Sequence, residues 1–173
     1  MKIDHIVISE DDIRKRVDEL GKKISEDYRG KDILVICVLK GAAIFMSDLV
    51  RRIEPLVEMD FISLSSYGDQ MTSSGAVKIK WNFVADVTGK HVLIVEDIID
   101  TGLTMSFLKE LISAKKPATL KVCAFLDKPS RRKVEIEADY VGYEIEDIFV
   151  VGYGLDFNQK GRQLPYVAAL KTD

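Results

Sequence analysis

Three carboxylates follow an apolar run in the middle of the chain. Residues 92–95 (Val-Leu-Ile-Val) predict a buried strand, Glu96 and Asp97 come directly after it, and Asp100 follows. Residues 101–104 (Thr-Gly-Leu-Thr) are typical of a turn into a helix, where backbone N–H groups attract anions. Because open α/β sheets bind ligands at the carboxyl ends of their strands, the segment predicts a site for a ligand with hydroxyls and a phosphate.

Each part of this segment also occurs in ordinary loops. An isolated Asp-Thr-Gly is often a turn in which Asp or Thr caps a helix, and paired acids after a strand are often solvated. Here the strand, the acid pair, the third acid and the Gly/Thr turn are contiguous. This contiguity favours a ligand site over a plain turn.

The elements that position these residues alternate along the chain. Helices are expected from Ser9 to about Gly30 and over residues 42–53 and 103–115. Strands are expected over residues 32–39, 57–64, 77–81, 92–95 and 119–126, with short apolar segments at 140–143, 149–152 and 166–170. This order predicts a parallel-sheet α/β domain, with the later short strands forming a small lobe over its edge.

Composition excludes several other classes of protein. With 173 residues and 47% hydrophobic content, the chain is expected to be one globular domain. A net charge of −3 gives no basic surface typical of nucleic-acid binding. Cys37 and Cys123 lie in apolar runs, have no metal-ligand or disulfide spacing, and are expected to be buried. Neither a membrane span nor a signal peptide is recognised, so the expected location is the cytoplasm.

The segment Glu96-Asp97-Ile98-Ile99-Asp100-Thr101-Gly102 resembles the phosphoribosyl-pyrophosphate (PRPP) motif of type I phosphoribosyltransferases. Its residue pattern is closest to that of the hypoxanthine-guanine phosphoribosyltransferase family, and further family motifs follow in the expected order over nearly the whole chain. The resemblance implies a type I phosphoribosyltransferase fold, α/β, with a parallel-sheet core flanked by helices and a small hood lobe. Residues 1–173 would form a single phosphoribosyltransferase domain.

The resemblance assigns roles within this motif. Glu96 and Asp97 would accept hydrogen bonds from the ribose 2′- and 3′-hydroxyls, and Asp100 would be the catalytic general base for purine N7. The 5′-phosphate would be held by backbone N–H groups and hydroxyls of the turn, formed by Thr101, Gly102, Leu103 and Thr104. Some relatives carry Lys in place of Leu103, so a side-chain contact to phosphate is in doubt at that position.

The pyrophosphate site is implied by two further segments. Lys40-Gly41 alone is usually only a turn, but the resemblance makes the Leu39–Lys40 peptide a cradle for pyrophosphate, in the cis form. Arg162 would contact pyrophosphate oxygens. The implied cofactor is Mg²⁺, associated with Glu96, Asp97 and Asp156.

The purine site is implied by residues after two later strands. Lys128 precedes a proline and would ordinarily be an exposed turn residue, but the family places this lysine against the purine O6. An ammonium donor selects a 6-oxo over a 6-amino base. Phe149 would stack on the ring, the Val150 main chain would read its edge, and Asp156 would lie nearby.

A polar segment at about residues 65–76 resembles the flexible catalytic loop of the family, with Ser66 and Tyr67 as its matching pair. Most such segments are plain surface loops. In an active enzyme, closure of the loop would exclude water from a reactive sugar.

Together these resemblances imply an enzyme of purine salvage. It would transfer phosphoribosyl from PRPP to hypoxanthine or guanine, giving IMP or GMP and pyrophosphate, as a homodimer or homotetramer without nucleic-acid or membrane partners. A non-catalytic PRPP-binding regulator of the same fold is the main alternative, although the acidic balance and the Lys128 and Phe149 pair argue against it. A phospho-acceptor receiver domain fits poorly, because the first core strand ends in Lys40-Gly41 without acids. The preference among hypoxanthine, guanine and xanthine stays open.

Overall fold

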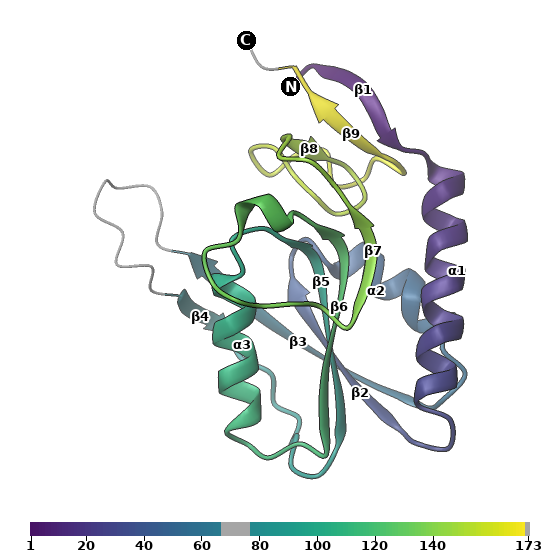
Figure 1. Ribbon diagram of the computed structural model, residues 1–173, viewed down its shortest axis with the longest axis vertical. Helices are drawn as coiled ribbons and strands as arrows, with labels where there is room; N and C mark the ends of the chain where they lie inside the picture. The colour runs from purple at the N-terminus through teal and green to yellow at the C-terminus, as the bar shows by residue number, and fades with distance from the viewer. Residues whose placement is uncertain (67–76, 172–173) are drawn as a thin grey trace.

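The computed structural model describes residues 1–66 and 77–171 (Figure 1). Side chains at positions 65, 66, 77 and 78 are not part of this description. The catalytic loop expected at residues 65–76 therefore lies almost entirely outside the described residues, as do Tyr67 and the side chain of Ser66.

A six-stranded sheet forms the centre of the molecule, in the order β4-β3-β2-β5-β6-β7 (Figure 1). All neighbouring strands are parallel except β3 and β4, which are antiparallel. The strands are β2 (Ile33–Leu39), β3 (Val57–Ser66), β4 (Val77–Trp81), β5 (His91–Ile99), β6 (Thr119–Asp127) and β7 (Tyr140–Glu144). The prediction of a mostly parallel α/β sheet is confirmed.

Helices cover both faces of this sheet. The helices are α1 (Glu10–Asp27), α2 (Ala43–Val50) and α3 (Leu103–Ser113). Val35 and Cys37 of β2 pack in one core cluster with α1 and α2, whereas Leu34 and Ile36 pack in a second cluster with α3. A strand buried on both faces needs an almost unbroken apolar sequence, which explains why β2 was recognisable. Cys37 and Cys123 are free and buried, as expected.

Helix α1 illustrates how local sequence defines an element. The Ser9 hydroxyl accepts a hydrogen bond of 3.2 Å from the Asp12 N–H and caps the helix start. Along the helix, Val17, Leu20 and Ile24 are buried at the spacing of one helical face. None of the helices within the described ranges is long and apolar enough to cross a membrane.

A second, smaller sheet forms the hood lobe, with strands β1 (Ile3–Ile8), β8 (Val150–Val151) and β9 (Val167–Leu170) in the order β1-β9-β8. The small lobe was predicted, but its membership was partly wrong. β7 pairs in parallel with β6 and belongs to the main sheet, because Tyr140 aligns with Cys123 and is itself buried. The N-terminal strand β1 was not predicted, since its mostly exposed pattern has no clear alternation.

Candidate active site

A cavity of about 430 Å³ opens at the carboxyl ends of β2 and β5. It brings together most residues predicted to bind PRPP. They are Lys40, Gly41, Glu96, Asp97, Asp100, Thr101, Gly102, Thr104, Asp156 and Arg162. Leu103 does not line this cavity, so the structure gives its side chain no contact with a ligand there.

A second cavity, of about 560 Å³, adjoins the first. It contains the residues predicted to bind the purine, and also three that were not singled out. Its lining is Lys128, Arg131, Asp147, Phe149, Val150 and Leu155, with Asp97, Ile98, Asp100 and Asp156 shared with the first cavity. The predicted general base, Asp100, therefore lies where the two cavities meet.

Glu96 and Asp97 form an acid pair with perturbed ionisation. Glu96 is only 7% exposed, and its carboxylate accepts a 3.1 Å hydrogen bond from the Asp97 N–H. Burial, and then the neighbouring Asp97 charge, raise the pKa of Glu96 well above its ordinary value. Burial also raises the pKa of Asp97, although hydrogen bonds and the Arg162 charge oppose the rise. Hydroxyl donors or a cation bound at this pair would therefore stabilise its ionised form.

The predicted pyrophosphate loop has the expected backbone form, since the Leu39–Lys40 peptide is cis. The Lys40 Nζ donates a 3.3 Å hydrogen bond to Gln159 Oε1, in the segment that also carries Asp156. Gly154 lies against the other side of the loop, because a Cβ atom there would fall 2.0 Å from the Gly41 carbonyl oxygen. The loop therefore lies against the segment after β8, which carries Gly154 and Gln159.

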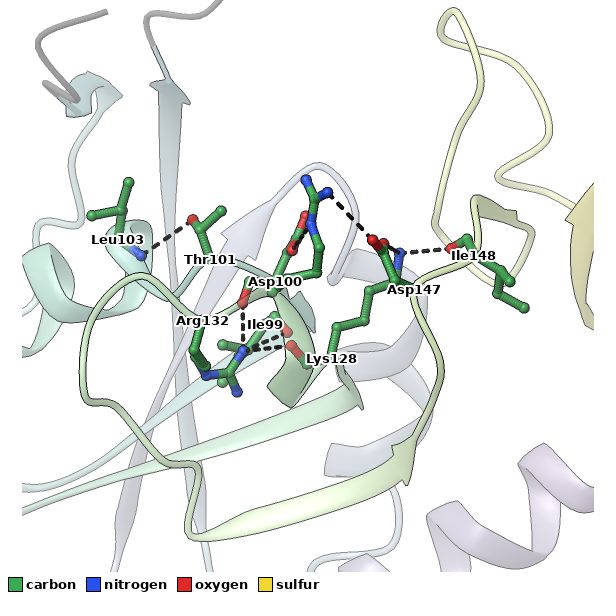
Figure 2. Close-up of polar contacts among 9 residues, drawn as sticks. Ile99, Asp100, Thr101, Leu103, Lys128, Arg132, Asp147 and Ile148 are labelled. Atoms are coloured by element: carbon green, nitrogen blue, oxygen red, sulfur yellow. Dashed lines mark hydrogen bonds and ion pairs between the residues drawn. The ribbon is translucent and has the colours of Figure 1, made fainter. Parts of the chain in front are cut away.

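The turn after β5 has the geometry of an anion site. Gly102 has a φ of 82°, in the left-handed region, and helix α3 begins at the next residue. The Thr101 hydroxyl accepts a 3.5 Å hydrogen bond from the Leu103 N–H (Figure 2). The first N–H groups of a helix have no partner within the helix, so this turn can present several donors to a phosphate.

Arg162 and Asp156 form an ion pair at the edge of the first cavity. The Arg162 guanidinium lies 2.5 Å from Asp156 Oδ1 and donates a 2.6 Å hydrogen bond to the Gly154 carbonyl. Within residues 1–66 and 77–171, no three His, Cys, Asp or Glu side chains gather closely enough to hold a metal ion. Mg²⁺ usually binds through one or two carboxylates together with substrate phosphates, and the few acids in this cavity fit that pattern.

The part of the site predicted to bind the purine is organised around Lys128. This lysine is only 7% exposed, its Nζ donates a 2.6 Å hydrogen bond to the Ile148 carbonyl, and Asp147 Oδ1 lies 4.0 Å away (Figure 2). An ammonium has three donors, so further hydrogen bonds to a ligand are available. Phe149 is 53% exposed and packs edge-on against Phe157, with 5.8 Å between the two ring centroids. An aromatic ring this exposed beside a cavity is suited to stacking.

Two arginines beside Lys128 were missed. Arg131, at the end of a short 3-10 helix (Pro129–Arg131), donates from Nε to Asp100 Oδ1 at 3.0 Å. Arg132 donates from one nitrogen to the carbonyls of Ile99 at 2.9 Å and Asp100 at 2.5 Å (Figure 2). The available signal was the Arg-Arg pair that follows Ser130, just after the Asp127-Lys128-Pro129 motif and beyond the end of β6.

Comparison with known proteins gives concordant matches. The model of the phosphoribosyl transferase domain matches residues 9–158. The chain is 49% identical to the hypoxanthine-guanine phosphoribosyltransferase of Bacillus subtilis, over 98% of this chain and 94% of that protein. It is 48% identical to the bifunctional protein TilS/HprT of Listeria monocytogenes over 99% of its own length, but spans only 26% of that longer protein.

The fold matches solved structures equally well. A crystal structure of a hypoxanthine-guanine phosphoribosyltransferase from Bacillus anthracis, with a HEPES molecule in its active site, superposes with a TM-score of 0.94. The two chains are 48% identical, and the match covers 98% of this chain and 100% of that one.

Proposed function

The chain belongs to the phosphoribosyl transferase domain family, and we propose that it is a hypoxanthine-guanine phosphoribosyltransferase of purine salvage. It transfers phosphoribosyl from PRPP to a 6-oxopurine, giving IMP or GMP and pyrophosphate. The observation that carries this function is the junction of the two cavities at Asp97, Asp100 and Asp156. A sugar in the first cavity and a base in the second would meet at Asp100.

In the first cavity, backbone groups and acids position PRPP. Glu96 and Asp97 accept hydrogen bonds from the ribose hydroxyls, and the turn from Thr101 to Thr104 binds the 5′-phosphate. Lys40 and Gly41 contribute backbone N–H groups to pyrophosphate, and Arg162 contributes its guanidinium. Positioning of this kind supplies a large part of the rate enhancement when there is little covalent chemistry for the protein to do.

In the second cavity, side chains select and activate the purine. Lys128 donates a hydrogen bond to the purine O6. A 6-amino base carries a donor at this position and cannot accept that bond. Phe149 stacks on the ring, and main-chain groups at Val150 read its edge. As purine N9 attacks C1′, the bond to pyrophosphate breaks and Asp100 accepts the proton from N7. The carboxylates around C1′ also stabilise positive charge on the sugar.

Mg²⁺ is part of the proposal. The ion would be held by carboxylates among Glu96, Asp97 and Asp156 together with substrate phosphates, and it would neutralise charge on the departing pyrophosphate. Support comes from the hard oxygen donors that line the first cavity. A cytoplasmic location and a homodimeric or homotetrameric assembly belong to the same proposal, and residues 1–173 are taken as one phosphoribosyltransferase domain.

The regulator alternative receives no support from these observations. A binding protein that only senses PRPP has no need of a second cavity with a buried Lys128 beside an exposed Phe149. The relatives from Bacillus subtilis and Bacillus anthracis, which match over nearly their full length, are both named hypoxanthine-guanine phosphoribosyltransferases.

The deciding experiment measures nucleotide formation from PRPP and Mg²⁺ with hypoxanthine, guanine, xanthine or adenine offered separately. We expect turnover of 6-oxopurines but not of adenine, and complete loss of turnover with a chelator. Asp100→Ala should lower kcat by roughly 10²- to 10⁴-fold, the usual contribution of a general base. Measurable PRPP binding without turnover of any base would overturn the enzyme assignment.

A further inference from the structure

Arg131 bridges two carboxylates at the base-binding cavity. Its Nε lies 3.0 Å from Asp100 Oδ1, and its NH1 lies 3.4 Å from Asp147 Oδ2. All three residues line the second cavity. Asp100 extends from the end of β5, whereas Asp147 comes from the segment before β8 (Figure 2). Arg131 therefore links the end of β5 to the segment between β7 and β8 at the proposed purine site.

The hydrogen bond occupies only one oxygen of the Asp100 carboxylate. The terminal torsion of an aspartate is broad and roughly two-fold, so a carboxylate without a fixed partner samples several orientations. A donor fixed on Oδ1 selects one of them and leaves Oδ2 for the ligand. The backbone of the same residue is also held, because Arg132 donates to the Asp100 carbonyl at 2.5 Å.

Charge balance gives Arg131 a second effect. Four carboxylates line or border the second cavity, and within that cavity the cations are Lys128 and Arg131. Lys128 is directed to the Ile148 carbonyl at 2.6 Å, which leaves Arg131 as the cation in direct contact with Asp100. The hydrogen bond to Asp100 and the nearby carboxylates also raise the pKa of Arg131, so this cation stays charged.

We propose that Arg131 is a positioning residue for this reaction, which holds Asp100 through Oδ1 so that its other oxygen receives the N7 proton of the purine. The inference rests on the proposed function, in which Asp100 is the general base. Asp147 acts on Asp100 only indirectly, because it contacts the other end of the Arg131 guanidinium. A plain surface ion pair is the competing explanation, because exposed pairs contribute little to stability and nothing to the reaction.

The test uses Arg131→Gln and Arg131→Lys, with Asp147→Asn as the outer variant. Arg14→Gln is the matched control, because Arg14 forms a comparably exposed ion pair, with Glu10 at 3.4 Å, far from the site on α1. For each variant, kcat and the KM values for PRPP and hypoxanthine are measured separately. We expect Arg131→Gln to lower kcat roughly tenfold or more with the KM for PRPP unchanged. Arg131→Lys should recover part of the loss, and Asp147→Asn should lose less.

Chemical rescue separates positioning from a structural role. In Arg131→Ala, millimolar guanidinium chloride should restore part of kcat, whereas potassium chloride at equal ionic strength should not. Wild-type kcat in Arg131→Gln, or a loss confined to the KM for PRPP, would overturn the inference while the proposed function stands. If the unaltered protein converts no purine at all, the proposed function fails first and the role of Arg131 with it.

Discussion

Gly41 lies directly against the carboxylate of Asp97. A Cβ atom at position 41 would fall 1.5 Å from Asp97 Oδ2 and 2.4 Å from its Cγ, far inside any normal contact. The cis peptide between Leu39 and Lys40 immediately precedes this glycine. The proposed pyrophosphate loop and the acid pair are therefore in close contact at a residue without a side chain.

Gly41→Ala should consequently damage PRPP binding. The new methyl group must displace either the Asp97 carboxylate or the loop, so we expect the KM for PRPP to rise roughly tenfold or more, as for misplaced binding groups. Steady-state kinetics with varied PRPP measures the effect. Gly89→Ala is the control, because φ there is also positive, at +70°, but a Cβ would meet nothing within 4 Å. That control should cost about 1 kcal/mol of stability and leave the KM unchanged. Equal KM values in the two variants would contradict the prediction.

The elements with strong local signals were predictable from sequence. Helix α1 has a capping serine and a buried stripe at Ile13, Val17 and Leu20, and β2 is apolar throughout. β1 has no such signal, because its stability depends on pairing with β9 at the other end of the chain. The placement of β7 failed for a related reason. A short apolar segment does not specify which sheet edge it joins, and only the parallel alignment with β6 decides it.

The candidate site also has a part that was predictable from sequence and a part that was not. Motif residues such as Asp97 and Asp100 are contiguous in sequence, and the structure places them in one cavity. The contact between Arg131 and Asp100 spans 31 positions, and Asp147 joins it from a third segment. Such a contact depends on how loops from different strands converge, and periodicity carries no information about that. The burial of Lys128 could not be predicted from the sequence either, because a lysine before proline is usually exposed.

Lys128→Met should remove the preference for 6-oxopurines without affecting PRPP. The variant deletes a charged donor, whose hydrogen bonds contribute about 1.5–3 kcal/mol, so kcat/KM for hypoxanthine should fall roughly 10- to 100-fold. Competition between hypoxanthine and adenine, measured by nucleotide yield, reports the loss of discrimination. Lys133→Met is the control, because Lys133 is exposed in the same loop. If the two variants behave alike, Lys128 does not read O6.

The acid pair should make the unliganded protein less stable as pH rises. Burial raises the pKa of both Glu96 and Asp97, so the folded protein binds more protons than the unfolded chain between the ordinary and the raised values. In that window the free energy of unfolding decreases with increasing pH. Urea denaturation in chelator-containing buffer, repeated from about pH 5 upwards, measures the slope.

Neutral variants isolate the contribution of the pair. Asp97→Asn should raise the melting temperature near pH 7 by roughly 2–4 °C, which corresponds to about 1 kcal/mol in a chain of this size, and it should abolish turnover. The gain should shrink at low pH, where the unaltered pair is already protonated. Glu58→Gln, which alters an exposed ion pair with Lys90, provides the control for a generic charge change. A stabilisation that is the same at every pH would speak against the buried pair as its origin.

The adjacent residues Arg131 and Arg132 should contribute unequally to stability. The Arg132 side chain is 17% exposed, pairs with the Asp127 carboxylate, and donates to the carbonyls of Ile99 and Asp100. Arg132→Met leaves a largely buried carboxylate and these carbonyls without their partner, so the free energy of unfolding should fall by about 3–5 kcal/mol. Arg131→Met removes a guanidinium that is 47% exposed, and the stability of this variant should stay close to that of the unaltered protein. Denaturant titration of the two variants measures this difference. Similar losses in the free energy of unfolding would mean that Arg131 is structural, and its positioning role would then rest on kinetics alone.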